Sequence, residues 1–210
     1  WSSDVCSSDL SDYANVLSEW TRKSEIYQGL DNKLFVQATY HAPTFRRAFG
    51  TAFPAIYGHG GRITRQELVD LSGDVEHFHT FFVSAYTPQA AWNDLHKRDS
   101  IWRVQMVSDE GRVRVGPAEI ALIKVDANLR EVYPYITRFH RTYLVRFPMT
   151  DIQGRPVLSP TTRSFAFIIA SALGTATLRW HVDPVLESYE AEGKKIDRKS
   201  TRLNSSHLVI

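Results

Sequence analysis

The chain has 210 residues, and its 25 Lys and Arg against 23 Asp and Glu give a formal net charge of +2. With 43% hydrophobic and 23% charged residues, the composition is that of a globular protein with a real core, and it argues against intrinsic disorder and collagen-like repeats. The near-neutral charge predicts no nucleic-acid partner. The longest stretch without Asp, Glu, Lys or Arg, residues 77–93, is too short and too polar to span a bilayer.

The two ends of the chain differ from the sequence between them. The first ten residues, WSSDVCSSDL, and the last thirteen, RKSTRLNSSHLVI, are rich in Ser and lack hydrophobic periodicity. Both resemble the translated sequencing-adapter read-through found at the ends of metagenomic genes. We therefore expect residues 1–10 and 198–210 to be non-native tails around a single domain, 11–197. The only cysteine, Cys6, lies in the first tail, so no thiol chemistry is expected of the domain.

The N-terminal part of the domain is expected to be helical, apart from one strand at residues 34–40. Asp12 is a plausible N-cap for a helix with a buried stripe that ends at Trp20. Residues 43–76 are predicted to form a short helical insertion. Its first helix would start at Pro43 and stop at Pro54, and its second would follow a capping box, Thr64 to Glu67.

From residue 78 onward, the sequence reads as strands with no clear helix between them. Phe139 is expected on the apolar face of one strand, and residues 120–125 are expected to be covered on both faces. This pattern predicts a mainly β protein, an antiparallel two-sheet β-sandwich of about eight strands with an N-terminal helix and the helical insertion. The later strands are expected at 78–86, 102–106, 113–115, 120–125, 139–147, 165–170 and 176–182.

A pair of histidines is the strongest candidate for chemistry. His77 and His79 would share one face of a strand, about 7 Å apart, and two such imidazoles can share a zinc ion with a third ligand. This pattern favours a metal-dependent hydrolase as an alternative function. The simpler interpretation is that the two histidines lie at the polar beginning of a strand and are exposed to water. The residues considered as a third ligand are His59, Asp74, Glu76 and His140.

A glycine-rich segment could bind an anion through its backbone amides. Gly58, Gly60 and Gly61, with Arg62 beside them, could form such a nest, although a flexible turn before the second helix explains the same residues. The segment is neither a P-loop nor a dinucleotide fingerprint. No nucleophile elbow occurs in the sequence either, so we expect no enzyme and no cofactor.

Two groups of aromatic residues have both a structural and a functional interpretation. Trp92, Trp102 and Trp180 could line a sugar- or lipid-binding face, but Trp102 and Trp180 lie on the apolar side of alternating strands, which favours the core. An arginine–tyrosine cluster could offer a stacking surface for single-stranded nucleic acid, an interpretation that the low net charge opposes. Its members are Arg138, Arg141, Arg146, Tyr133, Tyr135 and Tyr143.

Several short segments carry a resemblance to bacterial proteins. These are Trp20 to Arg22, Tyr27 to Leu30, Ala38 to Tyr40, Ala85 to Pro88, Trp92 to Leu95, Asp99 to Trp102 and Gly174 to Trp180. Over about residues 20–182 the chain resembles a group of bacterial cell-envelope lipoproteins that have no established activity. The resemblance implies a periplasmic address and a lipid anchor on a cysteine upstream of Ser11. A cytoplasmic address is the alternative.

Two classes of function therefore stay open. The first is a non-catalytic binding or structural module of the cell envelope, with a protein or a small ligand as its partner. The second is the metal-dependent hydrolase built on His77 and His79.

Overall fold

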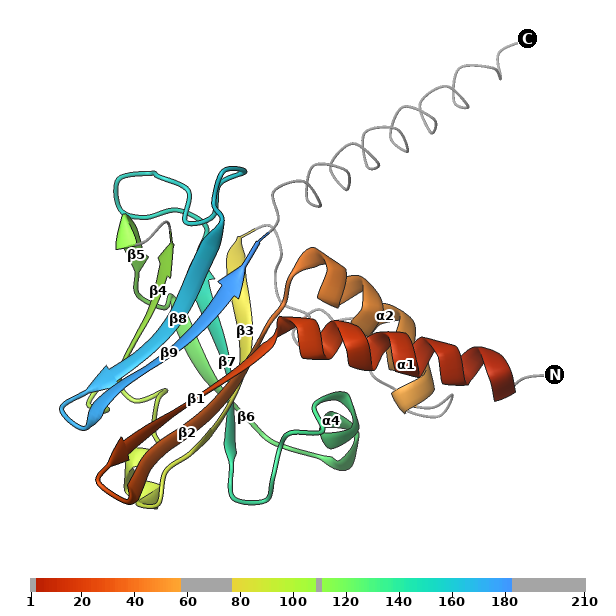
Figure 1. Ribbon diagram of the computed structural model, residues 1–210, viewed down its shortest axis with the longest axis horizontal. Helices are drawn as coiled ribbons and strands as arrows, with labels where there is room; N and C mark the ends of the chain where they lie inside the picture. Colours follow the sequence, from red (N-terminus) through yellow and green to blue (C-terminus); the bar gives the residue numbers. More distant parts are fainter. Residues whose placement is uncertain (1–2, 58–76, 109–110, 183–210) are drawn as a thin grey trace, which may run out of the picture.

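Strands with alternating apolar side chains build two antiparallel sheets in the computed structural model, which describes residues 3–57, 77–108 and 111–182 (Figure 1). The first sheet has the order β1-β2-β3-β7-β6, and the second has the order β5-β4-β8-β9. The first sheet consists of β1 (Thr21–Gln28), β2 (Asp31–Tyr40), β3 (Phe78–Tyr86), β6 (Glu119–Ile123) and β7 (Arg141–Pro148). The second consists of β4 (Arg103–Ser108), β5 (Val113–Val115), β8 (Ser164–Ser171) and β9 (Gly174–His181).

The core between the sheets is aromatic. Phe81 of β3 is fully buried, and its ring centroid lies 5.1 Å from that of Phe167 and 5.4 Å from that of Trp180. Trp180 also stacks on Phe165 at 5.3 Å, and its indole N–H donates to the Trp20 carbonyl at 2.9 Å. A buried Trp needs such a partner for its one polar atom. These contacts hold the two sheets face to face.

Helices cover the other face of the first sheet, so the fold has three layers (Figure 1). Because side chains alternate along a strand, Phe82 points away from the inter-sheet core, where its ring stacks on that of Tyr133 at 3.8 Å. The Tyr13 hydroxyl donates to the Val132 carbonyl at 2.8 Å. The covering elements are α1 (Ser3–Trp20), α2 (Pro43–Tyr57) and α4 (Ala127–Val132), and a 3₁₀ turn, η1 (Ala90–Trp92), follows β3.

The two sheets meet along their β1 and β9 edges. The Arg22 Nε donates across this seam to the Arg179 carbonyl at 3.0 Å. Gly174 makes the closest approach: a Cβ at this position would lie 2.6 Å from Cγ2 of Ile26. Its φ of +139° also lies in a region that residues with a side chain rarely adopt.

The predicted fold class is confirmed. The described residues contain nine strands in two antiparallel sheets, an N-terminal helix and the first helix of the insertion. The strand expected at 113–115 is confirmed as β5, which pairs with β4. The second predicted helix of the insertion, after Thr64, and the proposed tail 198–210 lie outside the described residues, whereas residues 3–10 of the first proposed tail form the start of α1. No helix among the described residues is long and apolar enough to cross a membrane.

Four local predictions were wrong, and two elements were missed. Helix α1 begins at Ser3, so Asp12 lies inside it, and α2 continues past Pro54 to Tyr57. Strand β6 is an edge strand with a half-exposed Leu122, not a strand covered on both faces. Phe139 precedes β7 and is 63% exposed. Strand β1 and helix α4 were not predicted, since each is short or polar.

We predict that Trp180→Ala lowers the free energy of unfolding by about 3–5 kcal/mol, because it empties a fully buried site beside the rings of Phe81 and Phe165. Urea unfolding followed by circular dichroism measures this change. Leu30→Ala is the control, since Leu30 is fully exposed, and it should change stability by no more than about 0.5 kcal/mol. Equal stability of Trp180→Ala and the parent would contradict the core assignment.

We also predict that Gly174→Ala costs about 1–3 kcal/mol, because the added methyl group strains the backbone and collides with Ile26. The same unfolding measurement applies. Gly116→Ala is the matched control, because a Cβ there meets nothing within 4 Å. A neutral effect at Gly174 would mean that β1 and β9 can separate without loss of stability.

Candidate functional site

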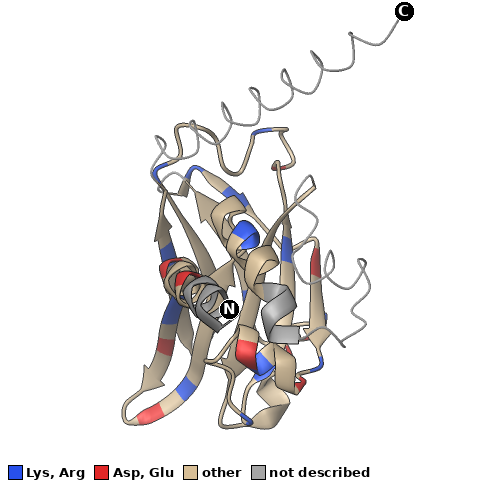
Figure 2. Cartoon of the chain, turned by 90° about the vertical axis from the view of Figure 1, so that its right-hand side faces the viewer, with Lys and Arg blue, Asp and Glu red and all other residues tan. Residues whose placement is uncertain are grey.

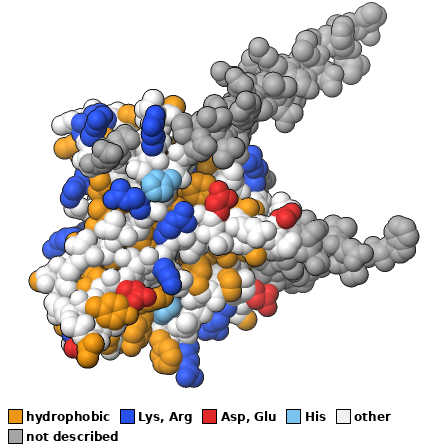
Figure 3. Space-filling model, in the orientation of Figure 1, with side chains coloured by type: hydrophobic (Ala, Val, Ile, Leu, Met, Phe, Trp, Pro, Cys, Tyr) orange, Lys and Arg blue, Asp and Glu red, His pale blue; other side chains and the backbone are white. Residues whose placement is uncertain are grey.

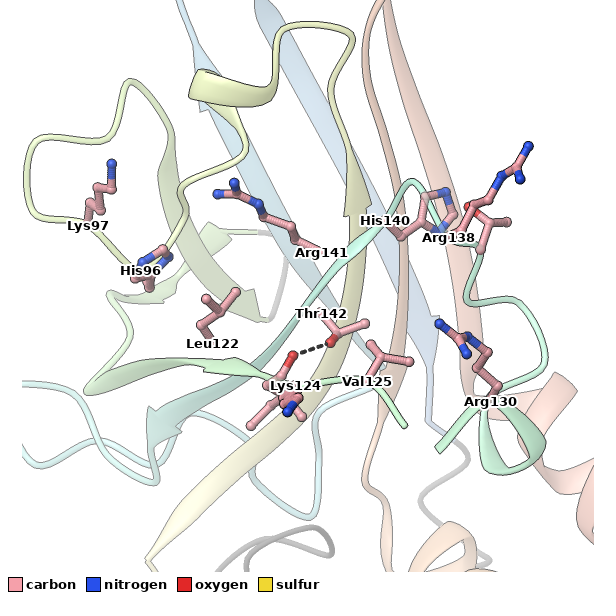
Figure 4. A pocket seen from close by; sticks show the side chains of 12 residues that line it. His96, Lys97, Leu122, Lys124, Val125, Arg130, Arg138, His140, Arg141 and Thr142 are labelled. Atoms are coloured by element: carbon pink, nitrogen blue, oxygen red, sulfur yellow. Dashed lines mark hydrogen bonds between the residues drawn. The ribbon is translucent and has the colours of Figure 1, made fainter. Parts of the chain in front are cut away.

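A cleft with a volume of about 710 Å³ opens where β6 ends and β7 begins (Figure 4). Four parts of the chain line it: the segment after η1, the end of β6, helix α4, and the turn into β7 together with its first residues. We call this cleft the basic cleft. Its lining residues are His96, Lys97, Leu122, Ile123, Lys124, Val125, Arg130, Thr137, Arg138, His140, Arg141 and Thr142.

The charge of the basic cleft has one sign. Its lining includes five Lys or Arg side chains and two histidines, and it includes no Asp or Glu. Elsewhere in the chain, Lys and Arg are interspersed with Asp and Glu (Figure 2), in keeping with a formal net charge of +2. A recess lined by charges of one sign, between protein walls, concentrates the field of those charges on whatever enters it.

One wall of the basic cleft is fixed by hydrogen bonds to Asn93, which is 4% exposed. Arg141 Nη1 donates to the Asn93 carbonyl at 2.7 Å, and the Tyr143 hydroxyl donates to the same carbonyl at 2.8 Å. The Asn93 amide in turn donates to the Ala85 carbonyl at 2.8 Å. Burial raises the pKa of Tyr143 to about 12, so its hydroxyl keeps its proton and remains a donor at neutral pH.

Three cations of the basic cleft have no anionic partner. Among the described residues, the side chains of Lys97, Lys124 and Arg130 make no ion pair and no hydrogen bond. Arg138 is also without a carboxylate, and its guanidinium lies over the ring of Phe139, 4.8 Å from the centroid. These groups are therefore available to an anionic ligand.

His140 is held in place by a buried serine. The Ser84 hydroxyl lies 2.8 Å from His140 Nδ1, and the imidazole stacks on Phe35, with centroids 5.5 Å apart. Ser84 is 0% exposed, so it cannot act as a nucleophile on a substrate in the cleft. Its role is to orient the imidazole, which leaves Nε2 for a ligand. Burial lowers the pKa of His140, so the ring is neutral at pH 7.

The two histidines of the predicted pair have different surroundings. His77 precedes β3 and is exposed, whereas His79 is 7% exposed and lies between the sheets, with Nδ1 3.1 Å from the Tyr40 hydroxyl. His79 Nε2 is buried and has no hydrogen-bond partner. At about 3.4 Å per residue, Ser84, which holds His140, lies roughly 17 Å along β3 from His79. His140 is therefore not the third ligand.

The other third-ligand candidates, His59, Asp74 and Glu76, lie outside the described residues. Among the described residues, no group of three His, Cys, Asp or Glu is placed to hold a metal ion. The zinc prediction for His77 and His79 therefore stays a prediction.

The remaining predicted sites have different outcomes. The anion nest of Gly58, Gly60, Gly61 and Arg62 lies outside the described residues. The core assignment of Trp102 and Trp180 is confirmed, since they are 3% and 0% exposed.

The arginine–tyrosine cluster does not form one surface. Tyr133 and Tyr143 are buried, and Arg146 forms an ion pair with Glu119 on the other face of the strand from Arg141. Arg138 and Arg141 both line the basic cleft. Reasoning from the sequence missed this cleft, because Lys97, Lys124 and Arg130 carry no motif and are far apart along the chain.

Comparison of the chain with protein-family models, with curated proteins and with solved structures found no match.

The buried His79 predicts that stability falls in mild acid. Desolvation lowers the pKa of His79 to about 4, and the nearby Arg46 charge adds a smaller effect in the same direction. In the unfolded chain the pKa is near 6.5, so the unfolded chain binds the proton more tightly than the folded protein. His79 therefore does not lower the free energy of unfolding above pH 6.5. Between pH 6.5 and 4, protonation of His79 in the unfolded chain lowers this free energy by at most about 1.4 kcal/mol per pH unit.

Urea unfolding at a series of pH values measures this loss. His79→Gln, which cannot titrate, should remove most of the slope between pH 6.5 and 4. A slope that is unchanged in the variant would show that His79 is not the group that titrates.

Proposed function

We propose that the protein is a non-catalytic binding module whose ligand is an anion bound in the basic cleft. The observation that carries this proposal is the set of three cations without a partner, Lys97, Lys124 and Arg130, in a recess with no acidic lining residue. The envelope setting is part of the proposal and rests on the sequence resemblance.

Electrostatics supports an anionic ligand. Like charges around one recess repel one another, and a bound anion replaces this repulsion with attraction to several cations at once. Each exposed ion pair alone contributes at most about 1 kcal/mol, so useful affinity requires contacts to several cations. The fixed Arg141 and the oriented His140 add donors whose positions are already set by Asn93 and Ser84, which lowers the entropy lost on binding.

Two observations support a binding role over a catalytic one. The only serine that contacts a cleft histidine, among the described residues, is the inaccessible Ser84. The lining residues include no carboxylate that could act as a general base beside His96 or His140. The metal-dependent hydrolase remains the alternative prediction, and no contact in the described part of the chain favours it.

The test is a titration with pyrophosphate, a compact anion that several cations can contact together, followed by calorimetry in low-salt buffer. We expect Lys124→Gln and Arg130→Gln each to weaken binding about two- to fivefold, because each variant removes one cation from the cleft. Binding to the wild type should also weaken as salt is added, because salt screens exposed charges.

Arg112→Gln is the matched control. It removes the same charge from an exposed position next to β5, in the other sheet, and should leave the affinity unchanged. Equal losses in all three variants would show a nonspecific effect of net charge, and the absence of pyrophosphate binding to the wild type would refute the proposed function.

A further inference from the structure

A second cleft, with a volume of about 490 Å³, lies at the tip of the β1–β2 hairpin. We call it the aromatic cleft, because Tyr86 and Trp92 line it from the end of β3 and from η1. Hydrophobic side chains gather at this end of the molecule, at the lower left of Figure 3, over the hairpin tip that Figure 1 shows there. The lining residues are Leu30, Asp31, Asn32, Lys33, Tyr86, Pro88, Gln89 and Trp92.

The polar groups of the aromatic cleft are planar amides and one balanced ion pair. Lys33 Nζ contacts Asp31 Oδ2 at 3.2 Å, so the cleft has no excess of either charge. The Asn32 side-chain oxygen is buried and accepts no hydrogen bond from the described residues, and Gln89 offers a second, exposed amide. Because the Asn32 oxygen is itself inaccessible, the exposed Gln89 amide is the group that the hydroxyl groups of a ligand can reach.

This combination suits a sugar ring. The C–H face of a sugar is apolar and packs on Trp or Tyr, while its hydroxyl groups form hydrogen bonds with amides and carboxylates. Binding sites of small ligands in general combine apolar walls with a few polar groups that fix orientation.

The aromatic cleft and the basic cleft adjoin each other. Tyr86 lines the aromatic cleft, and its ring centroid lies 6.3 Å from that of His140, which lines the basic cleft. Tyr86 also meets the exposed Phe139 ring at 6.5 Å, edge to face, and Arg138 covers that ring. Asn93 separates Trp92 of one cleft from His96 of the other along the chain. A single ligand can therefore contact both clefts.

We propose that the two clefts form one binding surface for an acidic glycan, with an uncharged sugar ring in the aromatic cleft and a carboxylate or other anionic substituent in the basic cleft. This inference rests on the proposed function, because it assigns the ligand class of the basic cleft. It adds a site for the uncharged part of the ligand, with Trp92 and Tyr86 as its ring platform and the Gln89 amide as its hydrogen-bond partner for hydroxyl groups.

The charge distribution favours a glycan over single-stranded nucleic acid. A nucleic-acid strand carries a phosphate at every nucleotide, so a protein groove for it is basic along its length, with aromatic side chains between the cations. Here the aromatic cleft holds Asp31 against Lys33, and the excess of cations stops at the basic cleft. A ligand with its anionic group at one end of an uncharged ring matches this distribution.

The experiment measures four probes by calorimetry: a tetragalacturonate that keeps one free carboxylate and is methyl-esterified on its other three residues, its fully methyl-esterified form, pyrophosphate and an octathymidylate. The first of these is called tetragalacturonate below. We expect the wild type to bind tetragalacturonate most tightly, and Trp92→Ala to weaken that binding at least tenfold while pyrophosphate affinity stays unchanged. The Trp92 carbonyl that accepts from the Trp102 indole is retained in this variant, and unchanged pyrophosphate binding verifies the fold. Gln89→Ala, at an exposed position, should weaken tetragalacturonate binding about threefold.

Lys124→Gln provides the complementary result. It should weaken binding of tetragalacturonate and pyrophosphate but leave the weaker binding of the uncharged ester unchanged, whereas Trp92→Ala should weaken the ester as well. Pyrophosphate binding with no response of tetragalacturonate to Trp92→Ala would overturn the glycan inference and leave the proposed function standing. Tighter binding of octathymidylate, lost in Trp92→Ala, would overturn it in favour of nucleic acid. No binding of any anionic probe would refute both proposals.

Discussion

The buried hydrogen bonds of Asn93 are the constraint on which both clefts depend. Asn93 accepts from Tyr143 and Arg141 of β7 and donates to Ala85 of β3, so one residue fastens the segment after η1 to two neighbouring strands of the first sheet. Trp92 precedes it in the aromatic cleft, and His96 follows in the basic cleft. Without this attachment, neither wall would have a fixed position, because loops of this kind contribute few apolar contacts of their own.

The sequence predicts the layers of the fold better than their edges. Alternation of apolar residues is unambiguous where a strand faces the inter-sheet core on one side, as in β2 and β9, and these strands were predicted near their observed bounds. Strand β1 is mostly exposed and polar, with Ile26 as its one buried residue, so its period is too weak to detect. Residues 120–125 are apolar without being covered, because β6 is an edge strand beside the basic cleft, where apolar side chains such as Leu122 line the recess. Composition alone does not distinguish a buried strand from the wall of a cleft.

The candidate site shows a different limit. Spacing of two residues placed His77 and His79 on one face of a strand, but β3 begins only at Phe78, and the interior of the sandwich takes His79 alone. One of the two histidines that do line a cleft, His140, is oriented by Ser84 from a strand more than fifty residues away in sequence, which the spacing of residues within one segment does not show. The same holds for the cations: only Arg138 and Arg141 are close in sequence, and the rest of the basic cleft is assembled by the pairing of β6 with β7 and by α4.

Net charge is a poor guide to the ligand of such a fold. A formal value of +2 averages over the whole chain, whereas a bound ion responds to charges within about one Debye length, some 8 Å at physiological salt. On the first sheet, Glu119 neutralises Arg146, and on the hairpin, Asp31 neutralises Lys33, so these cations are already committed. The excess of positive charge is left where no carboxylate lines the surface, between β6, α4 and the turn into β7. Because cations elsewhere are paired with carboxylates, the positive potential of the surface is concentrated at the basic cleft. It ends at the aromatic cleft, where Lys33 is paired with Asp31 beside Trp92.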